Sequence, residues 1–376
     1  MSNRPASATV ALTAADCLTP FGGAGASADA LLRGERALRL HPVLGRDGGD
    51  HVPLALVNEW QPTEGSGPRW AEPFFGLLAR VPDRPWGTPR YPIFLVSSNY
   101  GIDSMYAHHR EPGGGQHLPF ILPQRLTAWI SGRMGWGPNV SHYSHACVSA
   151  NLGLLYASRQ VNAGLAEEAL VISYDFLSPF VAGGFHAMKI LLGGEMPAPY
   201  ADREFGAIGL GDGAAFAVVS PLGGGHAEFR LEAQAGCNEM YHFTGNHPEG
   251  VGMSELGTTM RAATGDRPVW IKGHGTGTIE AGRLEARHMA AIFPDAPLVG
   301  WKGALGHTLG SCGLVELAIA VESVRRNRAP GTVGTSGPCF SAQVATGAFD
   351  LSSYGGVVLN AFAFGGAHYA CLLCHD

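Results

Sequence analysis

Short apolar runs that alternate with helical periodicities are the feature of this sequence that most limits its fold. Buried-strand patterns occupy residues 91–97, 169–173, 214–220, 357–362 and 370–374. Apolar residues repeat with helical spacing from Ser149 to Asn162, and Gly164 is placed to end that helix. We expect further helices over 284–293 and 313–325. Strands alternating with helices predict an α/β fold.

The N-terminal third has less regular patterning. The apolar run 8–12 precedes a segment, 14–27, that we expect to be a loop, and a short helix is expected to start at 29–32. Residues 41–92 are rich in Pro, Gly and Trp without a steady period, which predicts irregular cover. The Gly run at 113–115 predicts a mobile loop over 101–119.

Composition narrows the class of protein. The chain has 376 residues, 45% hydrophobic and 15% charged, with no repeat or linker, so we expect one compact unit. A net charge of -6 argues against nucleic-acid binding. Polar residues, Gly and Pro interrupt every apolar run, so no membrane insertion is expected. The first ten residues lack the apolar core of a signal peptide, and seven cysteines do not form a disulfide framework. We therefore expect a reduced, cytoplasmic protein.

Cys147 lies in the segment SHACVSAN, just before the helix expected from Ser149. A thiol there faces unpaired N–H groups and the positive end of the helix dipole, which favour the thiolate, and the same groups can hold an oxyanion. A buried core cysteine is the ordinary alternative. A metal site with His142 and His145 is a weaker one, because no second ligand cluster has the usual spacing.

Two further segments place histidines in glycine-rich loops. His274 follows an apolar run within IKGHGTGT, where small neighbours admit a ligand and threonine hydroxyls can bind an amide-bearing arm. His307 lies in KGALGHTLGSCG, five residues after Lys302, and Glu316 is placed to pair with that lysine. Taken singly, these segments also fit a capped turn and a turn before a helix. Together they supply a thiol and two histidines at element ends, where catalytic groups tend to lie.

These segments together resemble the β-ketoacyl-acyl carrier protein synthases, the elongating condensing enzymes of the thiolase superfamily that act in fatty acid and polyketide assembly. The blocks HACVSAN, GHGTGT, KGALGHTLGSCG and NAFAFGG (360–366) occur in the family's order, and LTAADCLTPFG matches its opening strand. The resemblance implies a thiolase fold, with two related α/β halves in a five-layer α-β-α-β-α arrangement. We place the half that carries Cys147 at 1–220 and the half with both histidine blocks at 221–376.

The resemblance also implies roles for the site residues. Cys147 would hold an acyl group as a thioester, while His274 and His307 would assist decarboxylation of a malonyl thioester. Lys302 and Glu316 would support them. Backbone N–H groups of Cys147 and Phe364 would form the oxyanion hole, with Phe364 also a gate. The pantetheine-binding residues would be Thr276 and Thr278.

The same resemblance implies partners and cofactors. The substrate would arrive on an acyl carrier protein, whose phosphopantetheine replaces any resident cofactor, and no metal is expected. The protein would be a homodimer, or a heterodimer with a chain-length-factor-like subunit. Two alternatives stay open: an acyltransferase that passes the Cys147-bound acyl group to an amine or hydroxyl, and a noncatalytic partner subunit of a synthase. Arg33, Arg36 and Arg39 are candidates for carrier-protein docking.

Three positions depart from the family pattern. Gly282 stands where an Asp usually follows HGTGT, Asp212 stands where Glu is frequent, and Ala363 replaces a common Gly. Two other motifs fit chance better than function. Residues 23–28 match a dinucleotide fingerprint only loosely. Cys371 and Cys374 would point to opposite faces of a strand and pack in the core.

Overall fold

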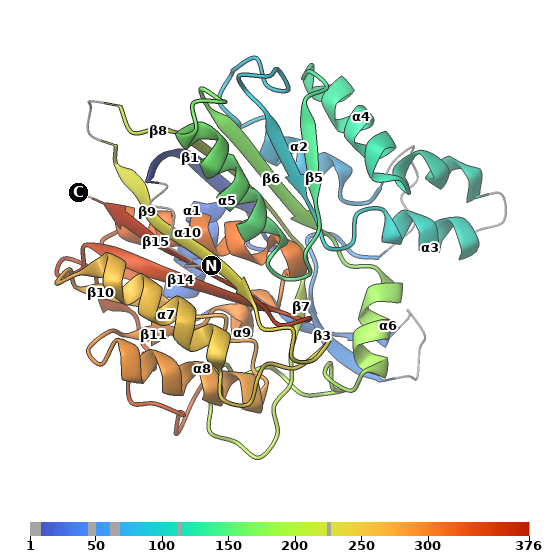
Figure 1. Cartoon of the computed structure of the whole chain (residues 1–376). Coiled ribbons are helices and arrows are strands. Elements are labelled where there is room, and N and C mark those ends of the chain that lie inside the picture. The colour runs from blue at the N-terminus through green and yellow to red at the C-terminus, as the bar shows by residue number, and fades with distance from the viewer. Residues whose placement is uncertain (1–8, 44–49, 61–67, 111–113, 224–226, 376) are drawn as a thin grey trace.

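A computed structural model describes residues 9–43, 50–60, 68–110, 114–223 and 227–375 (Figure 1). Its largest sheet has ten strands among these residues, in the order β11-β10-β14-β15-β9-β1-β8-β6-β4-β5. One half of that sheet consists of β1 (Val10–Leu18), β4 (Ile93–Val96), β5 (Val140–Tyr143), β6 (Ala169–Asp175) and β8 (Gly213–Pro221). The other half consists of β9 (Phe229–Asn238), β10 (Val269–Lys272), β11 (Leu298–Val299), β14 (Gly356–Ala363) and β15 (Ala367–His375).

The two halves of the sheet have the same topology. Counted along the chain within each half, the strands run third, second, fourth, fifth, first from the outer edge to the middle. In both halves the last two strands are antiparallel neighbours, and β1 pairs antiparallel with β9 where the halves join. The predicted boundary between the halves 1–220 and 221–376 falls at the end of β8. The second copy of this topology begins with the next strand, β9.

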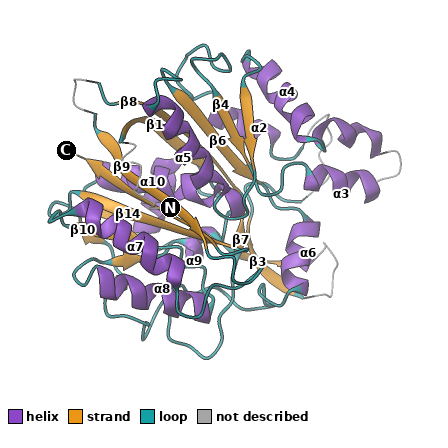
Figure 2. Ribbon diagram, viewed as in Figure 1, coloured by secondary structure: helices purple, strands orange, loops and turns teal. Residues whose placement is uncertain are grey.

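Helices fill both outer layers and the middle layer, as Figure 2 shows. Between the two half-sheets lie α1 (Ala24–Leu32), α5 (Ser149–Asn162) and α10 (Cys312–Arg325), and their apolar residues share one core with both half-sheets. The outer face of the first half-sheet packs on α2 (Ala71–Leu78). The outer face of the second packs on α7 (Val251–Thr264) and α8 (Ile279–Ile292). The five-layer α/β architecture predicted from the resemblance is therefore present.

Shorter elements lie around these layers. The remaining helices are α3 (Ile102–Arg110), η2 (Gly114–Phe120), α4 (Pro123–Met134), α6 (Pro179–Ala187), α9 (Lys302–Leu305) and η3 (Leu309–Ser311). The small sheets contain β2 (Arg39–Pro42), β3 (His51–Ala55) and β7 (Leu210–Gly211), and β12 (Arg328–Ala329) with β13 (Phe349–Asp350). In the part of the chain that the structure describes, no helix is both long and apolar enough to cross a membrane.

The C-terminal two thirds agree with the predicted elements. The helix expected over 149–162 has those bounds, and the strands expected near 93, 169, 214, 357 and 370 are all present. Cys371 and Cys374 point into different cores, as strand alternation predicts. These segments were predictable because each buries a whole apolar face, and burial dominates over local propensity.

Three predictions for the N-terminal third were wrong. Segment 14–27 is not a loop, because β1 continues to Leu18 along β8 and α1 already begins at Ala24, whose N–H donates to Asp16 at 2.9 Å. Segment 41–92 contains the end of β2, the whole of β3 and α2, while residues 44–49 and 61–67 lie outside the described part. Segment 101–119 contains α3 and η2, while residues 111–113 lie outside the described part. The first two segments are ordered by contacts with other elements of the fold, and in the third α3 packs on η2 and α6.

Candidate active site

Cys147 lies at a sharp turn between β5 and α5. Ala146 has a φ of 46°, the left-handed region that costs a non-glycine residue about 1 kcal/mol. The Ser149 hydroxyl stabilises the turn, since it accepts the His145 N–H at 2.7 Å and donates to the Ala146 carbonyl at 2.7 Å. This strained turn directs the thiol away from the helix axis and toward the second half of the molecule.

His274 and His307 lie beside one another, although 33 positions separate them in the sequence. Their ring centroids are 5.1 Å apart and the rings are perpendicular, at 89°. The His274 loop is fixed by Glu285, whose carboxylate accepts the N–H groups of His274 and Gly275 at 2.7 and 3.1 Å. The His307 N–H donates to the Gly209 carbonyl at 2.7 Å. Both loops are therefore held by hydrogen bonds from their backbone N–H groups.

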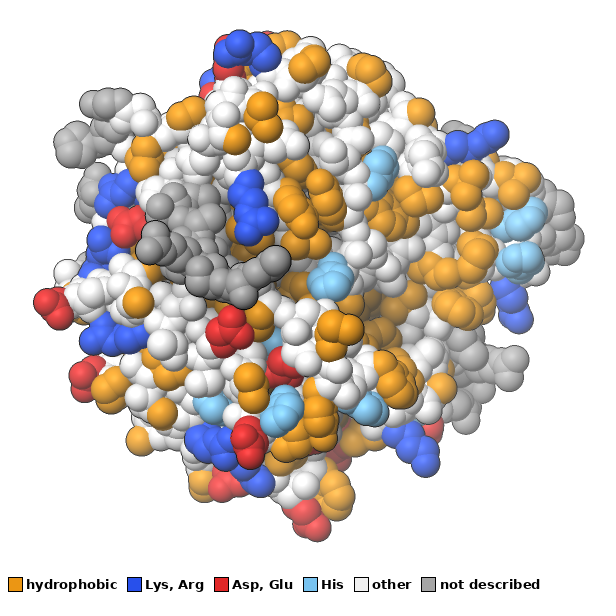
Figure 3. All heavy atoms as spheres, in the orientation of Figure 1, with side chains coloured by type: hydrophobic (Ala, Val, Ile, Leu, Met, Phe, Trp, Pro, Cys, Tyr) orange, Lys and Arg blue, Asp and Glu red, His pale blue; other side chains and the backbone are white. Residues whose placement is uncertain are grey.

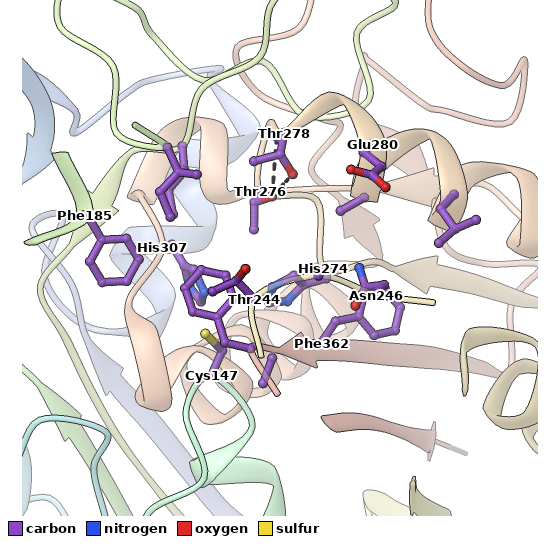
Figure 4. Close-up of a pocket in the computed structure, with 17 residues that line it drawn as sticks. Cys147, Phe185, Thr244, Asn246, His274, Thr276, Thr278, Glu280, His307 and Phe362 are labelled. Atoms are coloured by element: carbon purple, nitrogen blue, oxygen red, sulfur yellow. Dashed lines mark hydrogen bonds between the residues drawn. The ribbon is translucent and has the colours of Figure 1, made fainter. Parts of the chain in front are cut away.

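A cavity of about 250 Å³ brings the thiol and the two rings together (Figure 4). It is lined by Cys147, Phe185, Ile190, Ile208, Thr244, Gly245, Asn246, His274, Thr276, Thr278, Glu280, Ala281, Leu284, His307, Phe362, Ala363 and Phe364. The Thr276 and Thr278 hydroxyls are hydrogen-bonded to each other at 3.1 Å. Most of the lining is apolar near the thiol, and Figure 3 shows hydrophobic side chains around a hollow on this face of the molecule.

The turn between β14 and β15 brings Phe364 to the cavity. Gly365 and Gly366 have φ values of 84° and 75°, which only glycine adopts readily. The Phe364 N–H lies close enough to the Cys147 thiol to lower its pKa slightly, and the Phe364 ring lies 6.1 Å from the Phe185 ring of α6. Phe364 is 36% exposed. The turn therefore presents a backbone donor to the thiol and an aromatic ring to the solvent side.

Lys302 and Glu316 form a buried pair behind the histidines. Lys302 Nζ lies 2.7 Å from Glu316 Oε1 and donates to the His274 carbonyl at 2.8 Å. Lys272 makes a second ion pair with the same carboxylate. The pairing anticipated for Lys302 is present, and Lys272 adds a buried ammonium group that sequence reasoning missed.

Burial controls the protonation of the catalytic candidates. It raises the pKa of the Cys147 thiol to about 12, more than Lys302 and the Phe364 N–H lower it. The thiolate favoured by a helix N-terminus is therefore not the resting form. Burial, followed by the positive charge of Lys302, holds the pKa of His274 and of His307 well below the usual range. Both imidazoles are neutral near pH 7 and can donate a hydrogen bond.

The metal-site alternative finds no support in the geometry. The ring Nε2 of His142 lies 2.9 Å from the Thr127 hydroxyl, and His145 is exposed. No three His, Cys, Asp or Glu side chains among the described residues are grouped as metal ligands. Arg36 is also unsuited to docking, because its guanidinium is occupied by the carbonyls of Gly303 and Pro197.

Two departures from the family pattern can be located in the structure. Gly282 is buried in α8, an added Cβ there would make ordinary van der Waals contact with the Phe340 ring at 3.6 Å, and nothing in the structure explains the glycine. Asp212 accepts two hydrogen bonds from Arg69 at 2.8 Å, and others from the N–H groups of Val57 and Leu177. Both oxygens of the Asp212 carboxylate therefore accept hydrogen bonds, although aspartate is shorter than glutamate.

Sequence reasoning missed Glu285, Asp175 and the segment Thr244–Asn246. Glu285 is a buried acid in a helix of apolar neighbours, which is a usable signal. Asp175 follows a predicted strand and accepts N–H groups of Ser98 and Asn99 at 3.1 and 3.0 Å, which holds that loop near Gly310. Thr244–Asn246 gave no signal, because only the fold brings this loop to the cavity.

Comparison with known proteins defines the class. Residues 232–336 match the family model "Beta-ketoacyl synthase, C-terminal domain". A ketosynthase from Xenorhabdus doucetiae, solved with its chain length factor, superposes with a TM-score of 0.80, at 20% identity and 100% coverage of both chains. A β-ketoacyl synthase from Burkholderia phymatum also gives 0.80, at 19% identity, with 98% and 99% coverage. The fold is the thiolase fold of the ketosynthases.

Sequence relatives extend this result. The chain is 29% identical over 315 residues to 3-oxoacyl-[acyl-carrier-protein] synthase 2 of Coxiella burnetii, a match covering 76% of this chain and 75% of the relative. It is 27% identical over 277 residues to the tetracenomycin polyketide synthase ketoacyl synthase alpha subunit of Streptomyces glaucescens, covering 65% of this chain and 63% of that subunit. Residues 232–336 are therefore similar to the C-terminal domain of β-ketoacyl synthases, and most of the chain is similar to a 3-oxoacyl-[acyl-carrier-protein] synthase and to a polyketide ketoacyl synthase subunit.

Proposed function

We propose that this protein is a β-ketoacyl-acyl carrier protein synthase that condenses a malonyl thioester with an acyl group held on Cys147. The observation that carries the proposal is the meeting of one thiol and two neutral imidazoles in a single cavity, beside the Phe364 N–H. A thiol alone fits many reactions. Two neutral imidazole donors next to it fit stabilisation of an enolate, which needs hydrogen bonds rather than a strong base.

In the first half-reaction, Cys147 Sγ attacks the carbonyl of an acyl thioester. The Sγ–C bond forms, the C–S bond of the donor breaks, and the thiol proton passes to the departing thiolate. The backbone N–H groups of Cys147 and Phe364 hold the oxyanion of the tetrahedral intermediate. Because burial raises the pKa of Cys147 to about 12, deprotonation accompanies attack and does not precede it.

In the second half-reaction, the malonyl thioester loses carbon dioxide, and His274 and His307 donate hydrogen bonds to the resulting enolate oxygen. The carbanion then attacks the acyl carbonyl and the C–S bond to Cys147 breaks, which gives a β-ketoacyl thioester and a Cys147 thiolate that takes a proton from water. Lys302 and Glu316 hold the His274 loop through the carbonyl contact at 2.8 Å.

The substrate enters by the side of the cavity where Thr276, Thr278 and Glu280 lie. The threonine hydroxyls are free to exchange their mutual hydrogen bond for the amides of a phosphopantetheine arm, so no resident cofactor is required. The proposed partners are an acyl carrier protein and a second synthase subunit. Support comes from solved relatives: one ketosynthase is described in complex with an acyl-carrier protein and another with its chain length factor.

The test uses acyl- and malonyl-loaded carrier protein. We expect a covalent acyl adduct on Cys147 by intact mass, and carbon dioxide release with a β-ketoacyl product on adding malonyl carrier protein. Cys147→Ala should lose the adduct, whereas His274→Ala and His307→Ala should keep the adduct and lose condensation.

Other outcomes separate the alternatives. An adduct that transfers to amines or hydroxyls without decarboxylation indicates the acyltransferase. No adduct, with binding to a second synthase subunit, indicates a noncatalytic partner. Acylation that persists in Cys147→Ala would contradict the assignment of Cys147 as the nucleophile.

A further inference from the structure

This chain contains few lysines, and most of them lie at the candidate site. Of the 25 Lys and Arg residues, only Lys189, Lys272 and Lys302 are lysines. Lys189 is exposed, whereas Lys272 and Lys302 are 0% and 1% exposed and both contact Glu316. Burial of a second ammonium group on one carboxylate is costly unless something in the site uses its charge.

Strand alternation places Lys272 against the site. Trp270 and Lys272 face the middle layer from β10, while Val269 and Ile271 face α7 and α8. In the middle layer, Lys272 Nζ meets Glu316 of α10 and donates to the Gly273 carbonyl at 2.8 Å. The Trp301 ring lies 5.9 Å from Nζ.

The two lysines hold consecutive carbonyls of the His274 loop. Lys272 binds the carbonyl of Gly273, and Lys302 binds the carbonyl of His274 at 2.8 Å. Glu316 joins both ammonium groups, so the loop, α9 and α10 are tied at one point. Burial lowers the pKa of Lys272 to about 8, so both lysines are charged below about pH 7. With one carboxylate between them, the cluster then has a surplus positive charge behind the two imidazoles.

Titratable groups from several neighbouring elements interact with Lys272. They are Glu316 and Cys312 of α10, Lys302 of α9, Glu285 of α8, Cys371 of β15, and the loop residues His274 and His307. After burial and Lys302, the positive charge of Lys272 is a further cause that lowers the pKa of both His274 and His307.

We propose that Lys272 is a positioning residue for the condensation step: its ammonium group fixes the His274 loop through the Gly273 carbonyl and, together with Lys302, places positive charge behind both imidazoles. The proposal rests on the proposed function, because neutral imidazoles matter for enolate stabilisation. It goes beyond the Lys302–Glu316 pair, which alone satisfies the carboxylate. Removal of the Lys272 charge leaves burial and Lys302 in place. We therefore expect the acidic side of the profile of decarboxylation rate against pH (the acid limb) to shift, without a loss of activity at higher pH.

The test compares Lys272→Gln, which keeps a hydrogen-bond donor, with Lys272→Met, which keeps only the volume. Decarboxylation of malonyl carrier protein is measured against pH, and Cys147 acylation is measured separately. In both variants we expect the acid limb to move up by ~0.5 to 1 pH unit, because each unit of pKa corresponds to a tenfold change in the protonation equilibrium. Acylation should change less than about twofold. Lys189→Gln, an exposed lysine outside the cluster, is the matched control.

Two results would overturn the proposal. The first is a wild-type pH profile in both variants, and the second is a loss confined to Lys272→Met at all pH values, which indicates packing only. If Lys272→Met does not fold, Lys272→Gln decides. Histidine titration by NMR in wild type and Lys272→Gln tests the charge effect without turnover. A wild-type protein that is neither acylated nor able to decarboxylate malonyl carrier protein contradicts the proposed function. The NMR titration would still test whether Lys272 lowers the pKa of the two histidines.

Discussion

At the scale of single residues, burial determines the chemistry of the site more than local sequence does. Cys147, His274 and His307 are each buried to 9% exposure or less, and burial is the largest cause of each pKa shift. The same burial makes the lysine and glutamate cluster behind them sensitive to any loss of charge.

Reactivity of Cys147 should follow its raised pKa. With a pKa of about 12, the thiolate fraction rises about tenfold per pH unit throughout the range from about pH 7 to pH 10, so alkylation by iodoacetamide should rise without a plateau. Peptide mass mapping measures the rate at Cys147 alone, and Cys147→Ala serves as the blank. A plateau below about pH 8 would show that the thiolate is stabilised after all.

Glu316→Gln should destabilise the fold strongly. The substitution preserves shape but leaves Lys272 and Lys302 buried without a counter-charge, a defect that costs about 3 to 5 kcal/mol. Urea unfolding followed by circular dichroism gives the difference. Glu72→Gln is the control, because Glu72 is exposed in its pair with Arg133 and exposed pairs contribute little. Equal stability of the two variants would contradict the charge argument.

At the scale of elements, the cavity depends on how α6 begins. Ser178 is the N-cap of α6, and its hydroxyl accepts the Val181 N–H at 3.2 Å. This helix carries Phe185, which lies on Phe364 across the cavity mouth. The orientation of the Phe185–Phe364 ring pair is therefore tied to a capping interaction two turns away.

Loss of the Ser178 cap should cost about 1 kcal/mol of unfolding free energy. We expect Ser178→Ala to lower thermal stability and to raise amide hydrogen exchange in α6, because the first turn loses a partner. Ser178→Asp should retain most of the stability, since aspartate also caps. Unchanged exchange in α6 with Ser178→Ala would show that packing alone fixes the helix.

At the scale of the whole molecule, the two halves meet through their central helices. A Cβ at Gly313 of α10 would lie 2.3 Å from Asn151 Oδ1 of α5, far below van der Waals contact. The buried Asn151 side chain thus fills the space beside Gly313, and α10 has no room for a methyl group where it meets α5.

Gly313→Ala should therefore destabilise the protein, by about 1 to 3 kcal/mol as in other overpacked cores, and reduce Cys147 acylation. The control is Gly132→Ala in α4, an exposed helical glycine with nothing within 4 Å of an added Cβ. That substitution should stabilise the helix by about 0.5 to 1 kcal/mol. Denaturant unfolding measures both, and a stable Gly313→Ala variant would show that α5 and α10 can move apart.

Much of the fold was readable from sequence where a segment buries a full apolar face. The helix from Ser149 and the strands β6, β8, β14 and β15 were predicted for this reason. Segments 41–92 and 101–119 were misjudged, because their order comes from distant partners. Phe74, for example, packs on Tyr174 and Phe176, about one hundred positions away.

By itself, the sequence determined the residue types of the site: a thiol before a helix, two histidines in glycine-rich loops, and a Phe-Gly-Gly turn. Only the tertiary structure decided how they meet and how they are charged. It placed His274 beside His307, brought Lys272 onto Glu316, and replaced the expected thiolate by a neutral thiol. The physical reason is that motif spacing is local, whereas burial and charge pairing depend on segments far apart in the chain.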